Sequence, residues 1–220
     1  MLKIYGFPLS QPTRSVLMLC KENGIAYSWH LIDAIKGENR RNPEFKAAFP
    51  GNALVPTIDD KGFKLTESAA IMQYLAESRN TSKWYPEDAQ SRARTNAWLH
   101  WHHQNTRLST KGILTPTLFP QLPDREAHIA RGTKAYTVAL KHMEVHLAGR
   151  KFLTGDTPTL ADLLLVCEVD QLMPEAFNLF DYKPFPHVMR WLGDCRKDIK
   201  SYSEVFQPVV DIAKSRSANK

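Results

Sequence analysis

The sequence lacks the pattern of a disulfide-bonded secreted protein. It contains only three cysteines, Cys20, Cys167 and Cys195, which are far apart along the chain, and it has no Cys-x-x-Cys motif. This odd, scattered set favours free thiols in a reducing compartment. Residues 1–5 pass directly into an alternating strand pattern, so we expect no signal peptide and a cytoplasmic location.

Long hydrophobic runs are absent as well. No apolar stretch approaches the roughly 20 residues that a transmembrane helix needs, so we expect no membrane partner. The formal net charge of +6 comes from basic residues spread along the 220-residue chain. Because no nucleic-acid recognition module accompanies this charge, we expect no nucleic-acid partner. An acidic small molecule is a simpler reason for a basic surface.

The pattern of elements changes near residue 80. Residues 1–78 alternate between strand and helix in the order β-α-β-α-β-β-α, which predicts a small sheet covered by helices. Residues 79–88 are polar and include a helix-start signal, and we interpret them as a linker. Residues 89–220 contain only helical patterns. The sequence therefore predicts an α/β N-terminal domain and an all-α C-terminal domain.

Two stretches of the helical half are informative. Trp98, Trp101 and Leu108 share one stripe and predict a single long helix. Residues 160–172 are apolar nearly all round, which predicts a buried helix. Thr159 and Asp162 at its start have the spacing of a capping box, with aspartate in place of the usual glutamate.

The most informative segment surrounds a Val-Pro pair. We interpret residues 54–60 as a strand opened by Pro56, because proline cannot donate to a ladder. A cis Val55–Pro56 bond would turn the Val55 backbone away from the sheet, where it could pair with an extended, peptide-like ligand. After a turn and a second strand, a helix begins at Glu67 and Ser68, and its N-terminus suits a carboxylate. The segment predicts a site for a short peptide.

Several motifs point to one protein family. They are Val55-Pro56 with Glu67-Ser68, the run Gly155-Asp156-Thr157-Pro158-Thr159-Leu160-Ala161-Asp162, the run Ser10-Gln11-Pro12-Thr13-Arg14, and Trp101-His102-His103 with Arg107. Together they resemble the cytosolic glutathione transferases, and most of all the theta class, over essentially the whole chain. The resemblance implies a thioredoxin-like N-terminal domain that binds glutathione and a helical domain that supplies most of the electrophile pocket.

Within this resemblance, Ser10 is the expected catalytic residue. A hydroxyl that donates to the glutathione sulfur lowers the pKa of the thiol, and the helix that starts at Pro12 adds positive potential there. Two alternatives stay open. Ser10 could be only the N-cap of that helix. Tyr5 is a rival hydroxyl, because other classes use a tyrosine near the N-terminus, although its place within the first strand favours packing.

The resemblance assigns the ends of glutathione to separate groups. Ser68 would donate to the γ-glutamyl carboxylate, Glu67 would support the amine, and Val55 would pair with the cysteinyl backbone. Theta relatives usually have histidine and often lysine at the glycyl end, where this chain has Asn39 and Leu54; Arg40 or Arg41 could supply the missing charge. The expected glutathione-binding set is Ser10, Gln11, Asn39, Arg40, Leu54, Val55, Pro56, Glu67 and Ser68.

The expected electrophile pocket is formed by Trp101, Gln104 and Arg107. Arg107 aligns with a theta arginine that points toward the sulfur, where a cation favours the thiolate, so we count it as catalytic; a solvated helix arginine is the alternative. His100 and His103 share a helix face, but no third ligand is near, so we expect no metal. Glutathione is a co-substrate, and no further cofactor is expected.

The resemblance implies an enzyme that adds the glutathione thiolate to small electrophiles. Theta-like relatives favour alkyl or aralkyl halides, epoxides and, in a peroxidase reaction, organic hydroperoxides. The alternative is a non-catalytic ligand-binding or assembly module, because a fold alone does not prove activity. The family also implies a homodimer, with Phe63 or Phe49 inserted into the partner; the sequence does not choose between them.

Overall fold

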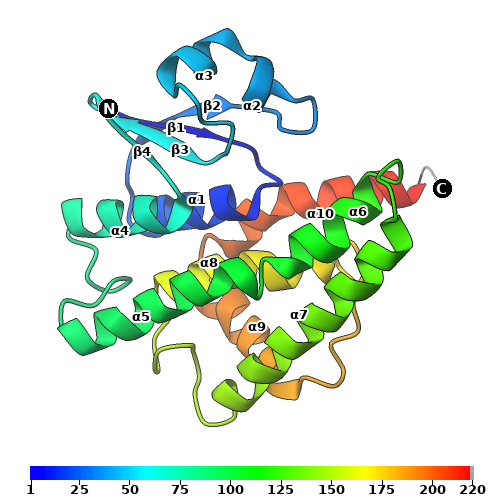
Figure 1. Cartoon of the computed structure of the whole chain (residues 1–220). Helices are drawn as coiled ribbons and strands as arrows, with labels where there is room; N and C mark the ends of the chain where they lie inside the picture. The colour runs from blue at the N-terminus through cyan, green and yellow to red at the C-terminus, as the bar shows by residue number, and fades with distance from the viewer. Residues whose placement is uncertain (219–220) are drawn as a thin grey trace.

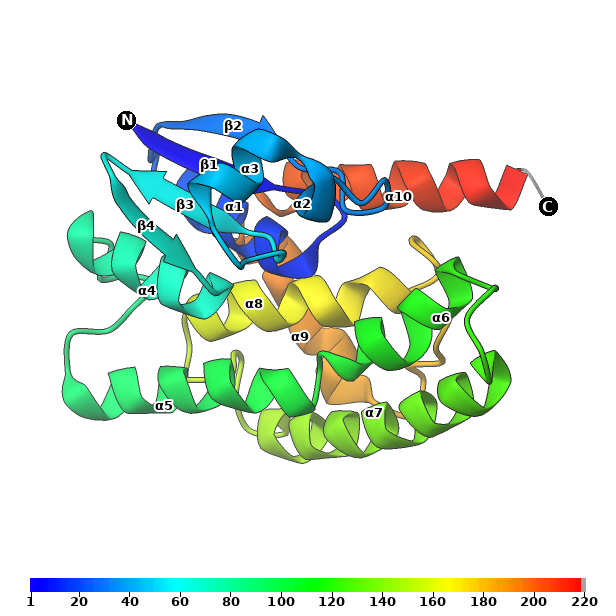
Figure 2. The ribbon, with the colours of Figure 1, turned by 45° about the horizontal axis from the view of Figure 1, so that its top comes forward.

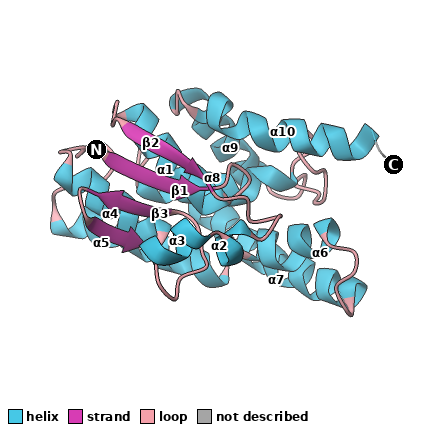
Figure 3. Ribbon diagram, turned by 90° about the horizontal axis from the view of Figure 1, so that it is seen from above, coloured by secondary structure: helices cyan, strands magenta, loops and turns pink. Residues whose placement is uncertain are grey.

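The N-terminal half of the chain is built on a four-stranded sheet (Figure 1). The computed structural model describes residues 1–218, so residues 219–220 of the expected helical domain lie outside the described residues. The strands are β1 (Leu2–Gly6), β2 (Tyr27–Leu31), β3 (Thr57–Asp60) and β4 (Phe63–Thr66). They lie in the order β2-β1-β3-β4 (Figure 3), with β1 parallel to β2 and antiparallel to β3.

Helices cover both faces of this sheet. Helices α1 (Gln11–Glu22) and α4 (Ser68–Ser78) lie between the sheet and the C-terminal half, whereas α2 (Glu38–Arg41) and α3 (Pro43–Ala48) lie on the other face (Figure 1). The alternation of β1 explains the division, because Leu2 and Ile4 are buried on the α1 side while Tyr5 points to the α3 side. The predicted thioredoxin-like order is confirmed, with two short helices where one was expected.

The C-terminal half is entirely helical. Its elements are α5 (Ala89–Trp101), η1 (His102–Gln104), η2 (Ser109–Leu114), α6 (Thr115–Leu118), α7 (Arg125–Leu147), α8 (Leu160–Val169), η3 (Asp170–Leu172), α9 (Pro186–Asp198) and α10 (Tyr202–Ala218). Helix α8 runs through the middle of the molecule and packs against α1, α5 and α9 (Figure 2). All ten of its residues are buried, as the sequence predicted.

The start of α8 is fixed by one carboxylate. Asp162 accepts hydrogen bonds from the backbone N–H groups of Thr159 at 2.9 Å and Leu153 at 3.0 Å, and from Trp191 Nε1 at 2.9 Å. The predicted capping box is confirmed. Its aspartate does more than cap the helix, because it also ties the preceding loop and α9 to the same point.

The expected single helix through Trp98, Trp101 and Leu108 is wrong. Helix α5 ends at Trp101, where the side chain of Asn105 donates to the Trp101 carbonyl at 2.8 Å. The Asn105 N–H turns instead to the carbonyl of His102, and the chain continues as a 3₁₀ turn and then a π-helical turn, η2. An asparagine side chain that binds backbone groups competes with the helix in this way.

The Val-Pro segment also differs slightly from the prediction. Strand β3 begins at Thr57, so Val55 and Pro56 precede the strand, and their peptide bond is cis. Lys61 and Gly62 form the predicted turn, both with positive φ. Among residues 1–218, no helix is both long and apolar enough to cross a bilayer.

Candidate functional site

A cleft of about 260 Å³ lies where the two halves of the chain meet. The sheet half contributes the loop after β1, the start of α1, Asn39 and residues 53–55. The helical half contributes η2, α6, Gln171 and Val209. The polar lining residues are Ser10, Gln11, Asn39, Arg107, Thr110, Thr115 and Gln171, and most of the rest of the wall is apolar. The cleft therefore combines several polar groups with an apolar wall.

Ser10 lies in this wall directly before α1. Its Oγ accepts the N–H of Thr13 at 3.4 Å and donates to the carbonyl of Val55 at 3.5 Å. Both contacts are long for hydrogen bonds. Ser10 is thus an N-cap that also faces the cleft, and the two roles considered from the sequence do not exclude each other. One lone pair of the Ser10 oxygen accepts the N–H of Thr13, whereas the hydroxyl proton makes only the long contact with the Val55 carbonyl.

Tyr5 is on the opposite side of the sheet. Its ring stacks on His30 with a centroid distance of 4.6 Å and meets Phe49 edge-on at 5.2 Å. These rings form a small cluster with Phe45 and Ile32 under α3. Tyr5 does not line the cleft.

The Val55 segment and the start of α4 are adjacent through the sheet. Thr57 pairs with Thr66, so the antiparallel register brings Glu67 level with Pro56. Glu67 is exposed and has a φ of 69°, and Ser68 opens the helix. Of these residues only Val55 lines the cleft itself. Pro56, Glu67 and Ser68 lie beyond its edge.

The candidate glycyl-end residues are divided between the cleft and the surface. Asn39 lines the cleft and donates from Nδ2 to the carbonyl of Ala53 at 2.7 Å. Leu54 also lines it and is 66% exposed. Arg41 donates to the carbonyl of Lys36, whereas the exposed side chain of Arg40 has no partner within residues 1–218. The Asn39 side chain therefore fixes the loop before Val55, and the Arg40 guanidinium is left without a partner among residues 1–218.

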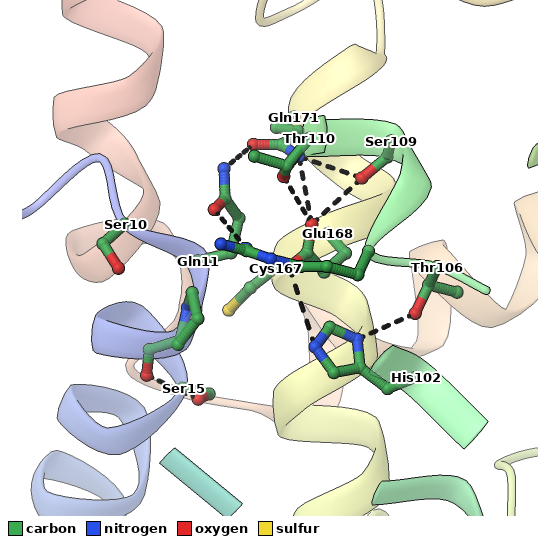
Figure 4. A network of polar contacts seen from close by, with 12 residues as sticks. Ser10, Gln11, Ser15, His102, Thr106, Ser109, Thr110, Cys167, Glu168 and Gln171 are labelled. Carbon is green, nitrogen blue, oxygen red and sulfur yellow. Dashed lines mark hydrogen bonds and ion pairs between the residues drawn. The ribbon is translucent and has the colours of Figure 1, made fainter. Parts of the chain in front are cut away.

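A polar network that includes Gln11, Glu168 and Gln171 joins both halves (Figure 4), and Arg107 bonds to two of its members. Arg107 Nη1 donates to Gln11 Oε1 at 2.8 Å and to Glu168 Oε1 at 2.6 Å. Gln11 in turn donates to Gln171. The network links the first residue of α1, beside Ser10, to the end of α8. Arg107 is therefore held in place and is not a freely solvated helix arginine.

Two groups in this network, Glu168 and His102, have pKa values shifted from their ordinary ones. Burial acts to raise the pKa of Glu168, but the Arg107 cation and several hydrogen bonds outweigh it, so the pKa is lowered. Burial also lowers the pKa of His102 to about 4, so its ring is neutral at pH 7. At neutral pH the site thus contains one ion pair, Arg107 with Glu168.

The other expected pocket residues lie away from the cleft. The Trp101 ring packs against Trp98 at 4.9 Å and His142 at 5.2 Å, and Gln104 is exposed in η1. Neither lines the cleft. Helix α5 ends at Trp101, so the helical periodicity that runs from Trp98 to Leu108 in the sequence does not describe how these residues face the cleft. In residues 1–218, no group of three or more His, Cys, Asp or Glu side chains could hold a metal.

The sequence reasoning missed several polar residues of the site. Glu168 and Gln171 occupy the stretch whose pattern predicts only an apolar buried helix, and Ser109 and Thr110 follow the break after α5. The signal was present, because a lone glutamate in a helix that is apolar all round needs a partner. The apolar side of the cleft, which includes Leu114, Leu118 and Phe119, was not predicted at all.

Comparison with known proteins agrees with this arrangement. The family described as Glutathione S-transferase, N-terminal domain, matches residues 4–83, and the family described as Glutathione S-transferase, C-terminal domain, matches residues 111–197. Glutathione S-transferase T1 of Arabidopsis thaliana is 40% identical over 206 residues, which cover 89% of this chain and 83% of that protein. Glutathione S-transferase T2 of the same plant is 36% identical over 98% of this chain, but the chain spans only 38% of its length.

A solved structure shows the same fold. Human glutathione transferase theta-2, in complex with glutathione and an unknown ligand, superimposes with a TM-score of 0.86 at 30% identity, covering all of this chain and 92% of that one. The predicted resemblance is confirmed at the level of both domains and of the class. The chain belongs to the glutathione S-transferase family and is similar to theta-class members of it.

Proposed function

We propose that the protein is a glutathione transferase in which Ser10 stabilises the thiolate. The observation that carries this proposal is the position of the Ser10 hydroxyl in the cleft wall, at the positive end of α1, with only long contacts to Thr13 and Val55. Such a hydroxyl can turn its proton to a sulfur anion, and a hydrogen bond to the charged form lowers the pKa of the thiol. The helix N-terminus acts in the same direction.

In the proposed reaction the thiolate sulfur attacks an electrophilic carbon. With a halide, the new C–S bond forms as the carbon–halogen bond breaks, and the halide ion leaves. With an epoxide, a ring C–O bond breaks and the oxygen takes up a proton. Organic hydroperoxides are a further proposed substrate class, for which glutathione is the reductant. The apolar side of the cleft, with Leu114, Leu118 and Phe119, suits a small hydrophobic electrophile beside the thiolate.

Glutathione would extend from the cleft toward the start of α4. Val55 offers its backbone N–H, which has no recorded partner within residues 1–218, to the cysteinyl part. Ser68, at the first turn of α4, would donate to the γ-glutamyl carboxylate, and Glu67 would support the amine. At the glycyl end the free cation of Arg40 is the proposed partner, because Arg41 is already bound to Lys36.

Ser10→Ala tests the proposal. It should reduce turnover of an alkyl halide by about two orders of magnitude or more, while the circular dichroism spectrum stays unchanged. Tyr5→Phe is the matched control, since Tyr5 packs under α3, and it should leave turnover close to wild type. A loss in Tyr5→Phe but not in Ser10→Ala would contradict the serine mechanism. Binding of glutathione without any turnover would favour a non-catalytic binding module.

We further propose a homodimer in which Phe63 is the exposed aromatic that meets the partner. Phe63 is 49% exposed and packs on Tyr74 at 4.8 Å, whereas Phe49 is buried against Tyr5. Sedimentation of Phe63→Glu should show a shift toward monomer. An unchanged dimer would remove Phe63 from the interface. A cytosolic location is the family's usual one and is proposed here on that basis.

A further inference from the structure

Glu168 is a fully buried carboxylate at the C-terminal end of α8, surrounded by donors from the helical domain. Its side chain is 0% exposed. Oε2 accepts the hydroxyl protons of Ser109 at 3.0 Å and Thr110 at 2.6 Å, and Gln171 Nε2 lies at 3.4 Å. Figure 4 shows these three side chains converging on Glu168. Every donor comes from a segment that lines or borders the cleft.

The fourth donor connects this carboxylate to the cleft. Arg107 binds Glu168 and Gln11 through the same nitrogen, Nη1, and its side chain is 22% exposed. Arg107 itself lines the cleft, as does Gln11, the residue after Ser10. The carboxylate therefore holds a cation that faces the reactants and, through Gln11, the start of α1.

The other titratable groups around Glu168 cannot take the place of Arg107. Arg14 is fully buried on α1 and donates to the carbonyls of Leu9 and Cys167. His102 lies 3.8 Å away on η1 but is neutral, and burial keeps the Tyr136 hydroxyl on α7 protonated by raising its pKa. Arg107 is thus the only cation bound to the Glu168 carboxylate among residues 1–218.

A buried ion pair is a poor device for stability alone. Desolvation of two charges often offsets their attraction, so apolar replacements can be equally stable. Asp170, only two residues away, offers a comparison on the same segment: it is also fully buried and paired with an arginine, Arg196, but neither residue lines the cleft. The Arg107–Glu168 pair differs from the Arg196–Asp170 pair because Arg107 lines the cleft.

We propose that Glu168 is a positioning residue for the transfer reaction: it holds the Arg107 guanidinium against the cleft wall beside Gln11 and partly cancels its charge at the glutathione sulfur. This inference rests on the proposed transferase function. The Glu168 carboxylate then has two effects that can be tested apart. It determines where the Arg107 guanidinium lies, and it reduces the positive field of that group at the sulfur.

Two substitutions separate these effects. Glu168→Asp keeps the charge but withdraws it by one methylene, so kcat should fall on the order of tenfold with the pH profile unmoved. Glu168→Gln keeps the shape but removes the charge. The Arg107 field is then no longer opposed, so the pH dependence of kcat/KM should move to lower pH. In an Arg107→Ala background, Glu168→Gln should cause little further change in kcat/KM.

Asp170→Asn is the matched control. It removes a buried, arginine-paired carboxylate from the same segment, so it should lower stability in urea while leaving kcat/KM and its pH profile at wild-type values. A purely structural role of Glu168 would make Glu168→Gln behave like Asp170→Asn, and this result would overturn the proposal. So would additive effects of the Glu168 and Arg107 substitutions.

The outcome separates this inference from the proposed function. If wild-type protein turned over no electrophile, the transferase function would fail. Ultraviolet titration of the thiolate in the glutathione complex would still test Glu168, with a lower thiol pKa expected in Glu168→Gln and an equal one overturning the proposal. If Glu168→Gln did not fold, Glu168→Asp would decide, because unchanged kcat there contradicts a positioning role.

Discussion

The two ends of helix α8 each bury one carboxylate, and they differ in the donors that meet it. Asp162 at the N-terminal end and Glu168 at the C-terminal end are both 0% exposed. Asp162 accepts from backbone N–H groups and a tryptophan N–H, all of them neutral. Glu168 accepts from hydroxyls, an amide and the guanidinium of Arg107.

This difference reverses the direction of the pKa shift. Burial raises the pKa of Asp162, and its neutral donors do not fully compensate. Burial works the same way on Glu168, but the Arg107 charge overcomes it and the pKa is lowered. Neutral hydrogen bonds satisfy a buried carboxylate without stabilising its charge as strongly as a cation does. The N-terminal end of α8, at Asp162, lies away from the cleft, and we call it the closed end; its carboxylate stabilises the fold. The C-terminal end, at Glu168, lies beside the cleft, and we call it the open end; its carboxylate binds a cation that lines the cleft.

Removing the carboxylate at the closed end should have the largest effect on stability. Asp162→Ala leaves the N–H groups of Thr159, Leu153 and Trp191 buried without an acceptor. At about 1–3 kcal/mol for each of these three unsatisfied groups, we expect a loss of roughly 3 kcal/mol or more in the free energy of unfolding. Urea denaturation followed by tryptophan fluorescence measures it.

The control is Asp156→Ala in the same loop. Asp156 is exposed, so its loss should change the free energy of unfolding by less than about 0.5 kcal/mol. Folded Asp162→Ala protein should keep the wild-type kcat, because Asp162 does not line the cleft. Equal stability of the two variants would show that Asp162 does not anchor α8.

The closed end was predictable from sequence because its signal is local. Thr159 and Asp162 are three residues apart, and the cap depends on that spacing and on the apolar run that follows. Ser10 before Pro12 is a similar case, since a short residue ahead of a helix start is visible along the chain. Strand alternation likewise indicated the sheet, and the place of Tyr5 within the first strand favoured packing, which the structure shows under α3.

The open end was not predictable, because its partners are distant in sequence. Arg107 and Glu168 are 61 residues apart, and Gln11 is 96 residues from Arg107. Their meeting depends on the break after α5, where Asn105 binds the Trp101 carbonyl. Periodicity alone carries the helix through that point, whereas Trp101 and Gln104, which the resemblance implies for the electrophile pocket, lie outside the cleft lining.

A pH-dependent loss of stability should come from the open end. His102 is neutral when folded, with a pKa of about 4 against an ordinary 6.5. Between these values the unfolded chain binds a proton that the folded protein does not, so this contribution is complete above pH 6.5 and is lost as the pH falls toward 4. At about 1.4 kcal/mol for each pKa unit, the loss is roughly 3 kcal/mol.

The His102→Gln variant should lack this part of the pH dependence. The test compares the free energies of unfolding of wild type and His102→Gln from pH 7 down to about pH 4. Exposed His103, replaced in the same way, is the control and should track wild type. Parallel curves for wild type and His102→Gln would mean that folding does not shift the pKa of His102.

The smallest of these effects should come from a single hydroxyl at the open end. Thr110 Oγ1 donates to Glu168 Oε2 at 2.6 Å and accepts from Gln171 Nε2 at 2.7 Å, so Thr110→Val, of nearly the same shape, removes one hydrogen bond to a charged group and one acceptor of the Gln171 amide. We expect a loss of about 1–2 kcal/mol at neutral pH. Thr117→Val, which removes only a bond from α6 to the Ile113 carbonyl in the preceding η2, should cost about half a kcal/mol or less.

The pH dependence of the Thr110→Val difference identifies its cause. The folded pKa of Glu168 lies below its ordinary value of 4.5, so the stability that depends on its charge is present above pH 4.5 and disappears as the pH falls through the folded pKa. The difference between wild type and Thr110→Val should shrink over that interval. A constant difference would assign the loss to packing and would remove the hydroxyl from the charge balance at the cleft.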